Sequence, residues 1–120
     1  MNTPIAATAK LNSTFEYAFG EIAKIHHQHM VIKGFWDSPR SDSDLCAHFH
    51  DEVSEIHDAC RHGNPPDDKI PGFSGAEAEC ADVILRIMDA ADQRGWRVAE
   101  ALVAKMQYNL SRPYKHGKKF

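Results

Sequence analysis

The 120-residue sequence lacks the features that define membrane-spanning and secreted proteins. No apolar run approaches the roughly 20 residues that a membrane-spanning helix needs. The N-terminus has no basic start followed by an apolar stretch, so we expect no secretion signal. Cysteine is scarce, and the odd number and lack of C-x-x-C spacing favour reduced thiols at Cys46, Cys60 and Cys80. These absences predict a cytoplasmic protein without a membrane partner.

The sequence also lacks repeats and any convincing alternation of apolar and polar residues that would indicate β-strands. Helical periodicity, interrupted by glycine and proline, predicts α-helices over about 13–34, 44–61, 76–94 and 98–111. Ser13 and Glu16 have the spacing of a capping box that would open the first helix. Ser43 or Asp44 is expected to cap the second helix, and Gly95 to close the third. We therefore expect an all-α chain.

The four predicted helices indicate a single domain over residues 1–120, with a protomer resembling a four-helix bundle. Its ends, 1–12 and 113–120, are expected to be flexible. Helices of this length bury only a modest core, because a small chain has a high ratio of surface to volume. We therefore expect further copies of the chain to cover part of each apolar face, in a homodimer or a homotetramer.

Charge is distributed unevenly along the chain. Residues 41–92 carry thirteen Asp and Glu against three Lys and Arg, whereas residues 93–120 carry one against seven. An acidic segment beside a basic one can bind a cation and an anion together, although solvated helix faces and a frayed basic end would have the same composition. The acidic segment would repel a polyanion, so we expect no nucleic-acid partner.

Two pairs of carboxylates have helical spacing. Glu52 and Glu55 stand three residues apart in the second predicted helix. Glu79 and Asp82 have the same spacing in the third. Because an i, i+3 pair lies on one helix face, two neighbouring helices could bring four carboxylates together. Such charges repel unless a cation neutralises them, and oxygen ligands select Mg²⁺ or Mn²⁺ over zinc.

The environment of Glu52 can also be predicted. Helical projection places it inside the apolar stripe of its helix, where an unpartnered carboxylate would be costly. Its partner could be a metal ion or, equally, an Arg or Lys from another helix. The third helix is apolar over most of its circumference, and its polar stripe consists of Glu79, Asp82, Arg86, Asp89 and Gln93. That stripe faces either water or a cleft.

A transition-metal site is a rival interpretation, because the chain has eight histidines. A di-iron bundle needs E-x-x-H on two helices, however, and no glutamate in this sequence has a histidine three residues later. The paired carboxylates are therefore the stronger candidates for a metal site.

Four short motifs follow one another in a distinctive order. Lys33-Gly-Phe-Trp36 precedes Glu52-Val-Ser-Glu55, and a proline-rich loop leads to Glu79-Cys-Ala-Asp82. Arg112-Pro-Tyr-Lys-His-Gly117 follows near the C-terminal end. In this order the motifs resemble those of the MazG-like all-α nucleotide pyrophosphohydrolases, over most of the chain from about residue 20. The resemblance implies hydrolysis of a nucleoside triphosphate between its α- and β-phosphates, which releases a monophosphate and pyrophosphate.

The resemblance also implies roles for individual residues. Mg²⁺, with Mn²⁺ as a substitute, would be held by Glu52, Glu55, Glu79 and Asp82. Glu52 or Glu55 would also act as the catalytic base. The implied phosphate-binding residues are Arg86, Lys105 and Asn109. Arg112 and Lys115 belong to the basic C-terminal end, which could close over the phosphates as further phosphate-binding residues or fray in solvent. His27 and Trp36 would line the base pocket, although Trp36 could also be an ordinary core or interface aromatic.

The predicted function is therefore Mg²⁺-dependent hydrolysis of (deoxy)nucleoside triphosphates, as in the removal of unwanted nucleotides from the pool. Two alternatives stay open. One is an enzyme resembling phosphoribosyl-ATP pyrophosphohydrolase, which shares the acidic pattern. The other is a catalytically silent helical module that binds partner proteins. The sequence does not indicate which base or sugar is preferred.

Overall fold

The computed structural model describes residues 5–119, and this part of the chain is helical without a β-strand. Its elements are α1 (Ile5–Ile32), α2 (Asp42–Arg61), α3 (Gly75–Arg94), α4 (Val98–Leu110) and the short 3-10 helix η1 (Tyr114–Gly117). The predicted all-α class and the four long helices are confirmed. None of the helices in the described range combines the length and the apolar character that crossing a bilayer requires.

The first helix begins earlier than the sequence predicted. Residues from Ile5 onward are already helical, so Ser13 and Glu16 lie inside α1 and the predicted capping box at this position is wrong. The alanine-rich segment before Ser13 favours helix, and the backbone there is bonded within the helix instead of needing a cap. Residues 5–12 are therefore helical, while the predicted flexibility of both chain ends stays a prediction.

Capping boxes do open α2 and α3. Ser41, and not Ser43 or Asp44, is the N-cap of α2, because its hydroxyl oxygen accepts from the Asp44 backbone N–H at 3.1 Å. Asp44 is the reciprocal partner in this capping box, with its carboxylate 3.4 Å from the Ser41 backbone nitrogen. Ser74 caps α3 in the same way. The third helix ends as predicted at Gly95, whose left-handed φ of 69° favours glycine.

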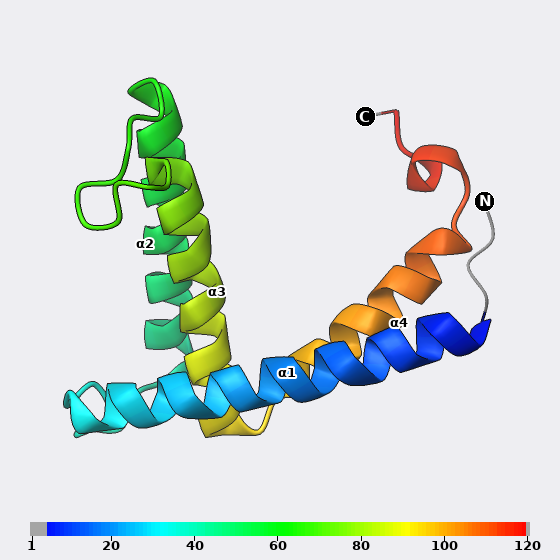
Figure 1. Cartoon of the computed structure of the whole chain (residues 1–120), viewed down its shortest axis with the longest axis horizontal. Helices are drawn as coiled ribbons and strands as arrows, with labels where there is room; N and C mark the ends of the chain where they lie inside the picture. The colour runs from blue at the N-terminus through cyan, green and yellow to red at the C-terminus, as the bar shows by residue number, and fades with distance from the viewer. Residues whose placement is uncertain (1–4, 120) are drawn as a thin grey trace.

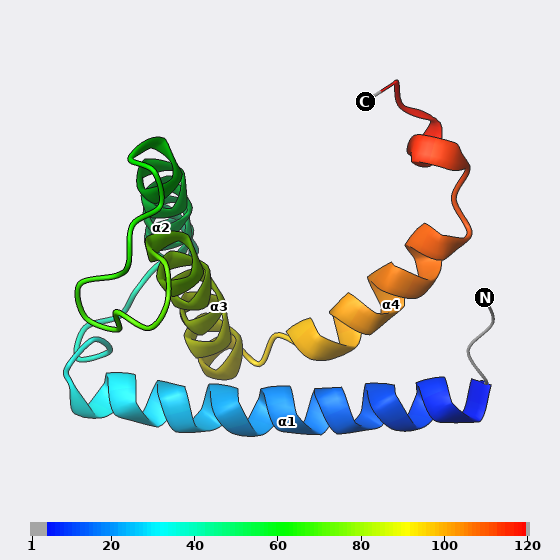
Figure 2. The same cartoon turned by 45° about the horizontal axis from the view of Figure 1, so that its top comes forward.

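The helices are arranged as an open framework along α1 (Figure 1). α2 and α3 pack side by side as a pair, and α3 packs on α1. α4 packs on the half of α1 that lies nearer the N-terminus. Figure 2 shows that α4 and the α2–α3 pair diverge from each other as they leave α1. The side chains buried where the helices meet are mostly small: Ala23, Leu45, Ala78, Met88, Ala90, Ala91 and Ala99.

This framework leaves a large surface for a chain of its size. Its accessible area is 9177 Å², whereas a compact monomer of 13.5 kDa exposes about 6,500 Å². The Cα radius of gyration is 17.2 Å, against about 13.6 Å expected for a compact chain of 120 residues. Much of the additional surface is apolar, including Tyr17, Ile22 and Ile25 on α1 and Met106 and Leu110 on α4. A single copy therefore leaves apolar helix faces uncovered.

Candidate functional site

Packing of α2 on α3 brings three of the four predicted metal ligands together. Glu79 and Asp82 lie one turn apart on α3, and Glu52 faces them from α2. One carboxylate oxygen from each of the three lies within 4.8 Å of the other two. We call these three residues the acidic cluster.

Glu55, the fourth predicted ligand, lies at the edge of the acidic cluster. Its side chain is exposed on α2 and lines a shallow groove of about 340 Å³ with Ser54, His57, Asp58 and Arg61. Its negative charge nevertheless contributes to raising the pKa of Glu79. Glu55 is thus close enough to act on the cluster electrostatically without being one of its three converging groups.

Crowding of the carboxylates raises pKa values in the cluster. Burial, followed by the negative charges of Asp82 and Glu52, raises the pKa of Glu79 from 4.5 to about 7. Burial also raises the pKa of Asp82, and the charge of Glu52 adds to this effect. Near neutral pH the cluster is therefore poised to lose a proton when a cation approaches.

Arg86 is the observed partner of Glu52. Its Nε donates to Glu52 Oε1 at 3.0 Å, and the side chains of Arg86 and Glu52 are 35% and 14% exposed. Of the two partners that the sequence allowed for Glu52, the structure contains the arginine from another helix. Arg86 also works against the increase in the pKa of Asp82. A phosphate reaching Arg86 would therefore compete with Glu52 for its guanidinium group.

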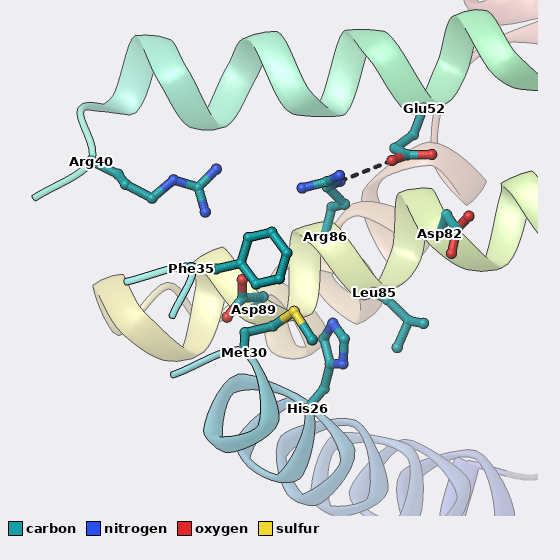
Figure 3. A pocket seen from close by; sticks show the side chains of 9 residues that line it. All are labelled: His26, Met30, Phe35, Arg40, Glu52, Asp82, Leu85, Arg86 and Asp89. Atoms are coloured by element: carbon teal, nitrogen blue, oxygen red, sulfur yellow. Dashed lines mark hydrogen bonds and ion pairs between the residues drawn. The ribbon is translucent and has the colours of Figure 1, made fainter. Parts of the chain in front are cut away.

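A cavity of about 270 Å³ adjoins the acidic cluster between α1, α2 and α3 (Figure 3). Its charged residues are Glu52, Asp82, Arg86, Asp89 and Arg40, and its remaining lining residues are His26, Met30, Phe35 and Leu85. Cavities that bind small molecules commonly combine an apolar wall with a few polar groups in this way. The arrangement suits a ligand with an apolar, planar part and a charged part.

His27 and Trp36, the predicted base-pocket residues, do lie together, with their ring centroids 5.4 Å apart in an edge-on arrangement. Both direct their polar atoms to Asp89, however. His27 Nδ1 is 2.6 Å from Asp89 Oδ1, and Trp36 Nε1 donates to the same carboxylate at 2.9 Å and 3.1 Å. Asp89 lines the cavity, whereas His27 and Trp36 do not, so the two predicted base-pocket residues are connected to the cavity through Asp89.

Sequence reasoning assigned no role to Asp89, although the signal was present. Asp89 belongs to the polar stripe of α3, seven residues after Asp82 and three after Arg86. It is only 7% exposed, which makes it the one buried polar or charged residue in the described core. A carboxylate on a mostly apolar helix implies a specific partner, but the sequence could not name it.

The predicted phosphate-binding residues on and after α4 are not brought to the acidic cluster within one chain. α4 diverges from the α2–α3 pair (Figures 1 and 2). Lys105 and Arg112 instead lie near the ring of Tyr108, and Lys115 near that of Tyr114. Asn109 Oδ1 is buried without a hydrogen-bond partner among the described residues. Of the implied phosphate ligands, only Arg86 lies at the cluster.

The donor set of the acidic cluster suits a hard divalent ion. All three converging groups are carboxylates, with no histidine or cysteine among them. Oxygen-only ligands are typical of Mg²⁺ and Mn²⁺, whereas zinc sites commonly use nitrogen or sulfur. Arg86 is bonded to Glu52, and the pKa of Glu79 is raised by burial and then by the charges of Asp82 and Glu52. The residues therefore fit the ion that the resemblance implies.

Searches of protein-family models, curated proteins and solved structures found no match to this chain.

Proposed function

We propose that this protein is an Mg²⁺-dependent pyrophosphohydrolase that cleaves (deoxy)nucleoside triphosphates to the monophosphate and pyrophosphate. The observation that carries the proposal is the convergence of Glu52, Glu79 and Asp82 beside a cavity with an apolar wall. A divalent ion at the cluster and a nucleoside in the cavity would together account for both features. The order of the sequence motifs supports the same chemistry.

In this proposal each carboxylate has a defined task. Glu52, Glu79 and Asp82 hold the ion, and Glu55 completes the set from the edge of α2. A bound Mg²⁺ neutralises phosphate charge and lowers the pKa of a coordinated water molecule. Because Glu52 is engaged by Arg86, the exposed Glu55 is the better candidate for the catalytic base. Mn²⁺ would substitute for Mg²⁺, since it accepts the same oxygen ligands.

We further propose that the protein works as a homodimer or homotetramer. The chain exposes about 2,600 Å² more than a compact monomer, so two copies that cover this excess would bury about 5,200 Å² in total, at the upper end of obligate homodimer interfaces. Covering the apolar faces of α1 and α4 would remove that excess. A second copy could also carry its own α4 to the acidic cluster of the first, where Lys105, Asn109, Arg112 and Lys115 would meet the phosphates. This assembly would reconcile their implied role with their position in the single chain.

The direct test is product analysis. The purified protein is incubated with Mg²⁺ and a panel of ribo- and deoxyribonucleoside triphosphates, together with phosphoribosyl-ATP, and products are separated by ion-exchange chromatography. Monophosphate and pyrophosphate in equal amounts are expected. Orthophosphate as the primary product would contradict the proposal, and turnover of phosphoribosyl-ATP alone would identify the alternative enzyme. If the protein hydrolyses none of these nucleotides and Mg²⁺ does not raise its thermal stability, a catalytically silent interaction module would be favoured.

A variant tests the role of Glu55. Glu55→Gln removes the charge at the edge of the cluster while keeping the size of the side chain, and we expect kcat to fall at least about 100-fold with the fold intact. Glu100→Gln makes the same chemical change on exposed α4 and serves as the control. Full activity of Glu55→Gln would remove Glu55 from the site.

We place the reaction in the cytoplasm, with removal of unwanted nucleotides as its purpose. The three cysteines, Cys46, Cys60 and Cys80, are exposed and unpaired, as expected in a reducing compartment. Fluorescence imaging of a tagged chain, together with nucleotide-pool measurements in cells lacking the protein, would test this placement.

A further inference from the structure

The buried carboxylate of Asp89 ties three segments of the chain together. It comes from α3 and accepts from His27 on α1 and from Trp36 in the connection between α1 and α2. Burying a charge is costly unless it is well hydrogen-bonded, and an apolar residue could fill the same space at lower cost. A carboxylate at this position therefore points to a task beyond packing.

The connection that Asp89 anchors also builds the cavity wall. Gly34 has a φ of 90°, and a side chain there would meet the Asp37 carboxylate at 3.1 Å, so the chain turns sharply at this glycine. After the turn, Phe35 lines the cavity, whereas its neighbour Trp36 reaches Asp89. Phe35 is 53% exposed, and its backbone N–H donates to the Met30 carbonyl oxygen at 3.1 Å. The anchoring of Trp36 at Asp89 adds a side-chain restraint on the far side of Phe35.

Trp36 extends the same support to Arg40. The Arg40 guanidinium carbon lies 4.9 Å from the centre of the Trp36 ring, within the range of a cation–π contact. Arg40 also lines the cavity, and Figure 3 shows its side chain extending into the same space as that of Arg86. One carboxylate thus controls an aromatic and a cationic group of the cavity wall through the indole of Trp36.

We infer that Asp89 is a positioning residue for the nucleoside part of the substrate, acting through Trp36 on Phe35 and Arg40. This inference rests on the proposed function, since it takes the cavity beside the acidic cluster to hold the nucleoside. Asp89 is not one of the three converging carboxylates of the acidic cluster. Its loss should therefore weaken recognition of the nucleoside and leave phosphate chemistry at the acidic cluster intact.

The kinetic test uses Asp89→Asn, which keeps the size of the side chain but removes its charge and one acceptor oxygen. We expect KM for a nucleoside triphosphate to rise about tenfold, the effect of weakening one charge-assisted hydrogen bond, while kcat stays within about twofold. Inhibition by inorganic pyrophosphate should not change, because pyrophosphate has no nucleoside. Asp92→Asn makes the same change at an exposed position of α3 and is the matched control. Equal weakening of nucleotide and pyrophosphate, or loss of kcat at constant KM, would overturn the inference.

A second measurement does not depend on hydrolysis. The chain has two tryptophans, so a Trp96→Phe background leaves Trp36 as the sole indole fluorophore. Titration with cytidine, uridine, adenosine and guanosine should change its emission, and Asp89→Asn in this background should weaken the response about tenfold. No response to any nucleoside, or the same affinity in both proteins, would refute the role of Asp89. If the wild-type protein releases no pyrophosphate, the proposed function fails, while this titration still decides the role of Asp89.

Discussion

The raised pKa of Glu79 leads to a stability prediction with an unusual sign. A carboxyl group whose pKa rises from 4.5 to about 7 on folding is protonated more readily in the folded chain than in the unfolded one. Its stabilising contribution is complete below pH 4.5 and is lost as the pH rises towards 7. Above that pH, folding must tolerate a charge that Asp82 and Glu52 repel.

The pKa shift of Glu79 sets the expected change in the free energy of unfolding. It corresponds to at most about 3 kcal/mol, and because water and salt reach the partly exposed cluster we expect about 1–2 kcal/mol. Glu79→Gln mimics the protonated form and can still donate a hydrogen bond to Glu52. Without divalent ions, this variant should therefore match wild type at pH 5 and exceed its melting temperature at pH 8 by about 4–8 °C.

Thermal unfolding followed by circular dichroism between pH 5 and pH 8 in EDTA measures this difference directly. All other ionisable side chains are common to both proteins, so their contributions cancel in the comparison. Glu100→Gln, in the first turn of α4, should differ from wild type by a small offset that is the same at pH 5 and pH 8. Adding Mg²⁺ at pH 8 should stabilise wild type more than Glu79→Gln. A variant that is less stable than wild type at pH 8 in EDTA would refute the reasoning.

Two further predictions concern the charge balance at the cluster and the uncovered apolar surface. Arg86→Met removes the partner of Glu52, so the metal-free protein should lose about 1–2 kcal/mol of stability while its affinity for Mg²⁺ rises several-fold. Calorimetric titration that finds weaker Mg²⁺ binding would contradict this competition. Met106→Asp places a charge on the exposed apolar face of α4, and sedimentation velocity should show a shift towards monomer. An unchanged assembly would exclude that face from the interface.

The helix boundaries show which structural features local sequence patterns can predict. Gly95 was predicted correctly because a left-handed residue at a helix end is a local requirement that glycine meets. Ser13 and Glu16 have the right spacing for a capping box, but spacing alone does not reveal that the preceding residues are already helical. A cap motif therefore predicts a helix start only where the residues before it disfavour helix.

The acidic cluster could be predicted from the sequence more fully than the contacts of the residues around it. Helical projection placed Glu52 on an inward face and the α3 carboxylates on one stripe, and packing of α2 on α3 brought them together. Which cation would partner Glu52 depended on the register between the two helices, and periodicity within one helix carries no information about that register. The same limit hid the contacts of Asp89 with His27 and Trp36, which lie 62 and 53 residues away in the chain.

Separation of α4 from the acidic cluster has a related origin. Amphipathic periodicity shows that α4 has an apolar face but not whether that face packs within the same chain or against another copy. In this protein α4 meets α1 and diverges from the α2–α3 pair, and Met106 and Leu110 stay exposed. The chain thus places its acidic groups and its basic C-terminal segment on separate arms of one framework. Because opposite charges attract and apolar faces favour burial, pairing the arms of two copies would satisfy both requirements at once.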